Sequence, residues 1–291
     1  MPLNIEPKIA AAAAELTAIR RDIHAHPELG FEEERTSQIV AKKLKEWGCE
    51  VTTGIGKTGV VGTIRVGNNP TAIGLRADMD ALPMDEYNTF DHRSQHKGRM
   101  HACGHDGHTT MLLGAAQYLS ATRNFDGTVH FIFQPAEEGR GGAEAMVKDG
   151  LFDKFPCEQI FGMHNRPKLD VGKFAIRSGP QMAGGGLFDI HITGKGAHGA
   201  RPESGVDPVI IATQIISALQ TVVSRSVAAL DSAVISVTQM HAGDAYNVIP
   251  NEAVLRGTIR AFKKETMALV KERIETISTG IAKTLGGVAK P

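Results

Sequence analysis

The stretch "TVHFIFQPAEEGRGGAEAMVKDG" (residues 128–150) sets the fold class of this chain. Its first six residues, 128–133, form a mostly apolar run of β-branched and aromatic side chains, which is typical of a buried strand. The loop "QPAEEGRGG" follows, and "AEAMVKDG" then predicts a short helix that ends at Gly150. A buried strand that leads through a loop into a helix is the repeating unit of an open α/β sheet.

The same pattern extends to both sides of this stretch. Apolar runs with β-branched residues predict further strands at 59–66, 71–75 and 159–164. Helical patterns occupy 20–48, where the turn "HPELGF" interrupts them, and 106–119. Strands that alternate with helices in this way predict an α/β fold with a doubly wound, mainly parallel sheet.

From about Gly184 the order of the elements changes. The order becomes strand, helix, strand, strand, helix, at residues 185–194, 206–225, 232–240, 252–262 and 263–285. This order predicts a ferredoxin-like α+β unit that lacks its final strand. We therefore predict two domains, residues 1–183 and residues 184–291, of which the second is incomplete at its C-terminal end.

The composition argues against several classes of protein. Lysine plus arginine and aspartate plus glutamate number 32 each, so no charge excess draws the chain to nucleic acid or to an anionic membrane. No run approaches the ~18 consecutive apolar residues that predict a membrane span. The cysteines Cys49, Cys103 and Cys157 are widely spaced, which favours a reducing compartment and a cytoplasmic location. Cys103 is then a free thiol or a metal ligand.

Four separate segments bring possible metal ligands to the ends of predicted strands. They are "RADMD", "HACGHD", "QPAEEG" and "GMHN", with the candidate ligands Asp78, Asp80, Cys103, His105, Glu137, Glu138 and His164. Each signal alone is weak, because a histidine after a strand is more often a hydrogen-bonded structural residue and paired glutamates are usually a solvated loop. Sites in open α/β sheets form at the carboxyl ends of strands, so the convergence of four segments predicts a metal site there.

The mixture of ligand types is compatible with a centre of two metal ions. A thiolate whose pKa is lowered by metal can bridge two cations, and imidazoles and carboxylates complete such sites. Two metals ~3.5–4 Å apart can activate a shared water and polarise a carbonyl oxygen. In the tandem of Glu137 and Glu138, one carboxylate can bind metal while the other takes the proton from that water and passes it to a leaving amine.

From Arg20 to about Phe262 the sequence resembles the metal-dependent amidohydrolases of the aminoacylase and carboxypeptidase type. Within that superfamily it is most similar to the branch of hippurate hydrolase and the plant auxin-conjugate hydrolases. The resemblance rests on the order and spacing of these stretches: "RRDIHAHPELGFEE", "GLRADMDALPM", "MHACGHDGHTTMLLGAA", "FIFQPAEEGRGGAEAMVKDG", "FGMHN", "GKGAHGARPESGVDP" and "NVIPNEAVLRGTIRAF". It implies hydrolysis of the amide bond of an N-acyl amino acid or a related small conjugate.

The resemblance also implies a role for each candidate ligand. Cys103 bridges two divalent metal ions, which are zinc or manganese or, alternatively, cobalt or nickel. The further ligands are His105, Glu138 and His164. Glu137 is then the general base and acid.

Several supporting residues follow from the same resemblance. Asp80 corresponds to a residue that holds a metal ligand in place. His198 corresponds to a histidine that binds substrate and steadies the developing oxyanion, often from the partner subunit, and Asn247 joins it. His101 and His108 are interpreted either as support for the ligands or as part of the helix start.

For the second domain the resemblance implies a lid and dimerisation module inserted into the catalytic domain. The expected assembly is a homodimer through this lid or, alternatively, a tetramer. The expected partner is a small N-acyl amino acid substrate, with neither nucleic acid nor membrane involved.

The end of the chain departs from the superfamily pattern. Members of that superfamily return from the lid into the catalytic domain, and the returning segment carries a fifth metal ligand, a histidine. Here the sequence ends at "GGVAKP", and none of its twelve histidines follows His241. A truncated chain, a second polypeptide and a non-catalytic remnant are all left open as explanations. The main hypothesis is an amide hydrolase, and the alternative is an inactive dimeric binding protein with a partial metal site.

Overall fold

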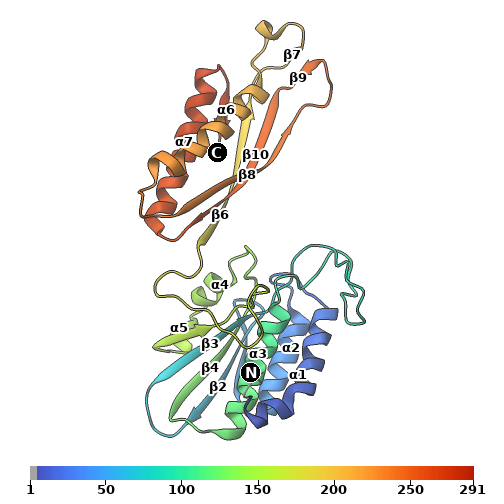
Figure 1. Cartoon of the computed structure of the whole chain (residues 1–291), viewed down its shortest axis with the longest axis vertical. Coiled ribbons are helices and arrows are strands. Elements are labelled where there is room, and N and C mark those ends of the chain that lie inside the picture. The colour runs from blue at the N-terminus through green and yellow to red at the C-terminus, as the bar shows by residue number, and fades with distance from the viewer. Residues whose placement is uncertain (1–4) are drawn as a thin grey trace. The chain divides into compact units, whose positions relative to one another are not determined.

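The computed structural model describes residues 5–291, which form two compact units (Figure 1). Unit 1 ends at Phe174 and unit 2 begins at Ala175. Residues 175–183 contain no helix or strand and group with unit 2, whereas the order of the elements alone suggested a boundary after residue 183. The catalytic and lid roles of the two units stay predictions.

Unit 1 is built on a five-stranded mixed sheet in the order β1-β2-β4-β3-β5. Its strands are β1 (Glu50–Ile55), β2 (Gly59–Val66), β3 (Ala72–Asp78), β4 (Gly127–Gln134) and β5 (Gln159–Gly162). β3 runs parallel to β4 and to β5, whereas β2 is antiparallel to both β1 and β4. Only β2 therefore runs against the common direction, which confirms the predicted α/β fold with a mainly parallel sheet.

Helices cover both faces of this sheet, as expected for a doubly wound fold. One face carries three long helices and the other two short ones: α1 (Pro7–Ala25), α2 (Glu34–Glu46) and α3 (His105–Thr122), then α4 (Gly142–Lys148) and α5 (Leu151–Lys154) (Figure 1). Alternation along β4 produces this division, because Phe131 and Phe133 pack into the core with α1–α3 while Ile132 packs with Met146 of α4. All of β4 is buried, as its apolar run predicted.

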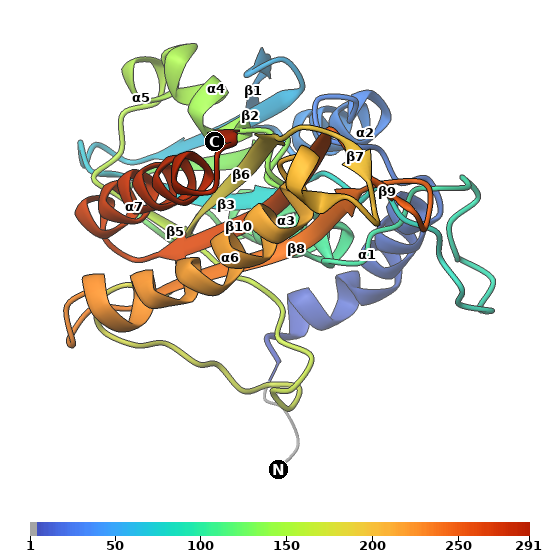
Figure 2. The ribbon, with the colours of Figure 1, turned by 90° about the horizontal axis from the view of Figure 1, so that it is seen from above.

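Unit 2 contains a four-stranded antiparallel sheet in the order β11-β6-β10-β8, with two helices side by side over it (Figure 2). Its main elements are β6 (Gly184–Thr193), α6 (Pro208–Thr221), β8 (Ala233–Ala242), β10 (Glu252–Ala261), α7 (Lys264–Thr284) and β11 (Val288–Lys290). The core between the layers contains Ile190 and Leu255 from the sheet and Ile215 and Ile274 from the helices. This is the predicted ferredoxin-like arrangement.

The prediction that the final strand of unit 2 is absent is wrong. β11 pairs antiparallel with β6, so that Val288 lies opposite Thr193 and Lys290 opposite His191. Gly286 adopts a φ of +82°, which reverses the chain after α7 and returns it to the edge of the sheet. A strand of three residues is too short to show alternation, so the glycines predicted the end of the helix but not the strand behind it.

The segment Pro208–Ser226, which is α6 with the π-helical turn after it, has the length and the mean hydropathy (1.3) of a helix that could cross a membrane. One side of this helix packs in the core of unit 2 through Ile211, Ile215 and Leu219. Core packing therefore accounts for the apolar residues on that side of the helix.

Candidate metal centre

Gly104 shapes the loop that leads into α3. Its φ of +89° lies in the left-handed region that residues other than glycine rarely adopt. A Cβ atom at this position would lie 2.8–3.0 Å from side-chain atoms of Asn165. The glycine thus allows the loop with Cys103 and His105 to approach the segment after β5, which carries His164.

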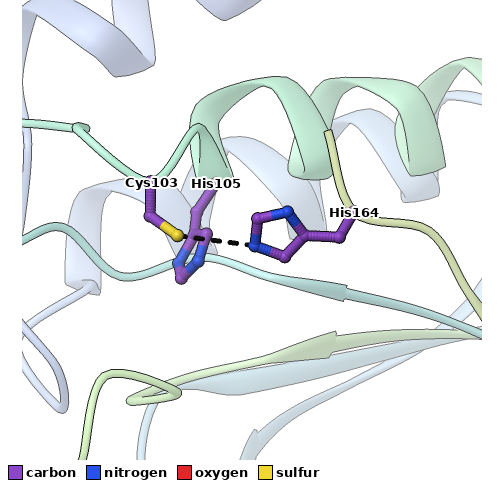
Figure 3. Close-up of side chains that lie close together, drawn as sticks. All are labelled: Cys103, His105 and His164. Atoms are coloured by element: carbon purple, nitrogen blue, oxygen red, sulfur yellow. Dashed lines mark hydrogen bonds between the residues drawn. The ribbon is translucent and has the colours of Figure 1, made fainter. Parts of the chain in front are cut away.

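Three groups of candidate ligands meet at His105, the first residue of α3. Within each group the ligand atoms lie within 4.8 Å of one another, and the groups are Cys103–His105–His164, Asp78–His105–His108 and His105–Glu137–Glu138. In the first group Sγ of Cys103 lies 3.4 Å from Nε2 of His164, next to the ring of His105 (Figure 3). The structure therefore brings together candidate ligands and the predicted base from all four of the predicted segments.

The ring of His105 is held in the orientation that a metal ligand requires. Its Nδ1 lies 3.1 Å from Oδ1 of Asp80, and because an ionised carboxylate can only accept, Nδ1 carries the proton and donates. Nε2 is buried and without a hydrogen-bond partner among the residues that the structure describes. An unpaired buried lone pair, with the other ring nitrogen fixed by a carboxylate, is the arrangement found at metal-binding histidines, so the residue fits a metal ion.

Nε2 of His105 also faces two further carboxylates. It lies 3.6 Å from Oδ2 of Asp78 and 3.8 Å from Oε1 of Glu138. Burial by itself would lower the pKa of His105, but the hydrogen bond to Asp80 and the charges of Asp78, Asp80 and Glu138 outweigh burial and raise it. Oxygen and nitrogen ligands thus surround one point at the end of the sheet.

Acidic groups accumulate around Cys103. Burial, reinforced by Glu138, Asp78 and Glu137, raises the pKa of this thiol to about 12. Burial and the charges of Glu138 and Asp78 likewise raise the pKa of Glu137. A divalent cation is the group that would offset this concentration of negative charge and convert the thiol to a thiolate ligand. Thiol, imidazole and carboxylate together suit a borderline-soft metal such as zinc.

Asp80 links two of the candidate ligands. Its Oδ1 accepts from His105, and its Oδ2 accepts the backbone N–H of Glu138 at 2.9 Å. These two hydrogen bonds lower the pKa of Asp80 even though its burial acts in the opposite direction. Asp80 therefore contacts the metal-ligand loop and α3 at once, in the manner expected of a residue that orients ligands.

A second buried chain of hydrogen bonds was only partly foreseen from the sequence. Nδ1 of His108 lies 2.6 Å from Oδ1 of Asp78, and the backbone N–H of Asn165 donates to Nε2 of His108 at 3.0 Å. The hydrogen bond from His108 and the charges of His105 and Arg76 lower the pKa of Asp78 to about 2, against the effect of its burial. This chain supports the backbone next to the candidate ligand His164. In the sequence, the spacing of His105 and His108 by one helical turn places His108 near the ligands but does not indicate Asp78 as its partner.

The two predicted substrate-binding residues of unit 2 are neighbours there. His198 belongs to β7 (Ala197–His198) and pairs with Val248 of β9 (Val248–Ile249). The backbone N–H of Gly199 donates to the carbonyl oxygen of Asn247 at 2.7 Å. Both His198 and Asn247 are exposed in unit 2, and their contribution to substrate binding stays a prediction.

Comparison with known proteins agrees with this chemistry. The profile described as peptidase family M20/M25/M40 matches residues 74–282, which is most of the chain. The chain belongs to this family. This membership confirms the superfamily predicted from the sequence. The sequence is also similar to proteins named as hydrolases.

Two relatives and one solved structure illustrate the similarity within the M20 family. The chain is 49% identical to hippurate hydrolase of Campylobacter jejuni over 280 residues, which cover 96% of the chain and 73% of the relative. It is 44% identical to an IAA-amino acid hydrolase of Arabidopsis thaliana over 265 residues, which cover 91% of the chain and 60% of that relative. The Bacillus subtilis YXEP protein, described as a dinuclear metal-binding peptidase of the M20 family, superimposes with a TM-score of 0.78 at 39% identity and covers 97% of the chain and 73% of its own length. These similarities support the predicted hippurate and auxin-conjugate hydrolase branch.

Proposed function

We propose that this chain is the metal-binding part of a dinuclear amidohydrolase that cleaves N-acyl amino acids or related small amide conjugates. The observation that carries the proposal is the convergence of Cys103, His105, Glu138 and His164 with Glu137 at one end of the sheet. The relatives named as hydrolases of hippurate and of IAA-amino acids support the same class of substrate.

In the proposed site, Cys103, His105, Glu138 and His164 would hold two divalent ions, and the thiolate of Cys103 would be the ligand suited to contact both. The ions supply Lewis-acid polarisation of the amide carbonyl and a lowered pKa of water when they are bound. Zinc or manganese fits this mixture of sulfur, nitrogen and oxygen ligands.

Glu137 is the proposed proton carrier. Its raised pKa, caused by burial and by the charges of Glu138 and Asp78, brings its carboxylate closer to the working pH. The carboxylate takes a proton from the attacking water and donates it to the nitrogen of the leaving amine. Asp80 keeps His105 and the backbone of Glu138 in place during both transfers.

Unit 2 is the proposed lid and dimerisation domain. His198 and Asn247 would bind substrate and stabilise negative charge on the carbonyl oxygen, with His198 acting across the dimer. The proposed location is the cytoplasm, in keeping with the free thiols of Cys49, Cys103 and Cys157.

The proposal is tested by measuring metal content and hydrolysis on the same preparations. Hippurate, N-acetyl amino acids and IAA-amino acids are supplied to the 291-residue chain and to the longest reading frame that contains it, with zinc or manganese. We expect two metal ions per chain and release of the amino acid by at least the longer form. Metal binding without hydrolysis of any amide by either form would favour the inactive binding protein. Absence of metal binding by both would reject the proposal.

A further inference from the structure

Glu33 is a fully buried carboxylate that the proposed chemistry does not use. It lies in the turn between α1 and α2, and its side chain is 0% exposed. Burial raises the pKa of Glu33, because a carboxylate loses its hydration when it is enclosed. A group that is costly to bury needs compensating contacts, and those contacts indicate its role.

Its two oxygens bind different parts of unit 1. Oε1 accepts the backbone N–H of Ala136 at 2.8 Å, and Oε2 accepts the hydroxyl of Thr58 at 2.6 Å. Ala136 is itself fully buried and has a φ of +50°, in the left-handed region that costs an alanine ~1–2 kcal/mol. The hydrogen bond from its amide to Glu33 holds this residue in a conformation that it would otherwise leave.

Ala136 directly precedes the candidate base. Glu137 lies between two anchored amides, since Glu33 accepts from Ala136 on one side and Asp80 accepts from Glu138 at 2.9 Å on the other. Two buried carboxylates from separate segments thus fix the backbone on both sides of Glu137. The direction in which its side chain leaves the backbone depends on both anchors.

The turn that carries Glu33 also packs tightly on the same loop. A Cβ atom on Gly30 would lie 3.0 Å from Cα and 3.1 Å from Cβ of Ala136. The guanidinium of Arg140 donates to the carbonyl oxygen of Gly30 at 3.0 Å. The segment 26–33 between α1 and α2 therefore supports the loop of Glu137 through the close contact of Gly30 and through the Glu33 hydrogen bond.

We infer that Glu33 is a positioning residue that orients the candidate base Glu137 through the backbone amide of Ala136. The inference rests on the proposed function only for the role of Glu137. The structural link from Glu33 to Ala136 can be tested separately from catalysis.

The first test measures hydrogen exchange of residues 134–139 in the 291-residue chain, with a peptide from α7 as internal reference. Glu33→Leu removes the acceptor, so exchange in this segment should accelerate by about tenfold. Glu33→Gln should restore protection, because its carbonyl oxygen can accept from Ala136 while its amide donates to Thr58. Thr58→Val is the matched control: it removes the other hydrogen bond of the same carboxylate and should leave the segment protected. Equal protection in Glu33→Leu and the wild type would overturn the inference.

The second test measures steady-state kinetics and metal content on the longest active form. Glu33→Leu should lower kcat by about 10–100-fold with KM and metal content unchanged, and it should shift the acidic limb of the pH profile of kcat/KM. Thr58→Val should lower the thermal stability about as much as Glu33→Leu does, with little change in kcat. Glu33→Gln should retain most of the wild-type activity. If Glu33→Leu and Thr58→Val lower kcat equally, the role of Glu33 is structural only.

A second variant covers the case in which Glu33→Leu does not fold. Gly30→Ala leaves Glu33 intact and pushes on Ala136, so it should also lower kcat without loss of metal. Unchanged kcat in a folded Gly30→Ala variant would count against the inference. Glu137→Gln distinguishes failure of the proposed function from failure of the inference about Glu33. If that variant remains active, the proposed role of Glu137 fails, whereas the exchange data still decide whether Glu33 holds the loop.

Discussion

The two units bury different kinds of side chain. Unit 1 encloses Asp78, Asp80, His105 and His108, each at most 3% exposed, at the end of its sheet. Within residues 5–291 the buried polar side chains of unit 2 are limited to Thr266 and Ser278, and its interior is otherwise aliphatic. Because buried charges are costly unless a partner or a cation compensates them, the difference indicates that unit 1 is organised around a site and unit 2 around its own packing.

The largest expected effect concerns the candidate base in unit 1. Glu137→Gln keeps the size of the side chain but cannot accept a proton, so turnover should fall by ~10²–10⁴-fold or more while metal content is unchanged. Rates on an N-acyl amino acid and elemental analysis measure both quantities. Glu144→Gln, at an exposed position of α4, is the control and should keep full activity. Retained turnover in Glu137→Gln would remove this residue from the mechanism.

The second prediction concerns the bridging ligand. Cys103→Ser should bind less metal, because a hydroxyl is a far poorer bridging anion than a thiolate near neutral pH. Cys157→Ser, outside the three ligand groups, should bind as much metal as the wild type. Elemental analysis after dialysis compares them. Full metal content in Cys103→Ser would contradict the assignment of the bridge.

The third prediction separates the two units by their response to metal. Zinc or manganese at ~100 times its dissociation constant should stabilise unit 1 by about 2.7 kcal/mol and slow hydrogen exchange there, with little change in unit 2. Ile215→Ala should do the reverse, since loss of a fully buried side chain weakens unit 2 by ~2–5 kcal/mol without changing metal content. If metal slowed hydrogen exchange equally in both units, the predicted difference between them would be wrong.

The smallest expected effect is a pH dependence confined to unit 1. Burial lowers the pKa of His101 from its usual 6.5 to about 4, so this side chain is neutral in the folded protein. Its contribution to stability is fully present above pH 6.5 and is lost as the pH falls toward 4, at up to about 1.4 kcal/mol per pH unit. His101→Asn, compared with the wild type in EDTA, should remove this part of the slope from the unfolding free energy. An unchanged slope would show that His101 titrates normally.

Periodicity and residue type predicted the elements of the fold for a physical reason. β4 is buried on both faces and therefore has a continuous apolar run, and α7 has an apolar face that recurs with the helical period. The candidate ligands were predictable because the carboxyl ends of parallel strands converge. β11 was missed because its pairing with β6 depends on tertiary contact rather than on a local pattern.

The supporting contacts could not be predicted in the same way. Asp78 and His108 are 30 positions apart, and Glu33 and Ala136 are 103 apart, so no local spacing indicates that they meet. A buried glutamate also looks like a solvated one in a sequence, since its environment comes from other segments. Glu33 lies in a turn rich in charged residues, where exposure is the natural expectation.

The contact of Gly104 with Asn165 limits how this site can change by mutation. Any side chain at position 104 must both adopt a left-handed backbone and displace an amide group that lies within 3.0 Å. Single substitutions at Gly104 should therefore be rejected in a mutational library, even when they leave every ligand in place. A smaller residue at Asn165 would relieve the close contact but not the strain of the left-handed backbone, so glycine should persist at position 104 when the ligand loop is diversified.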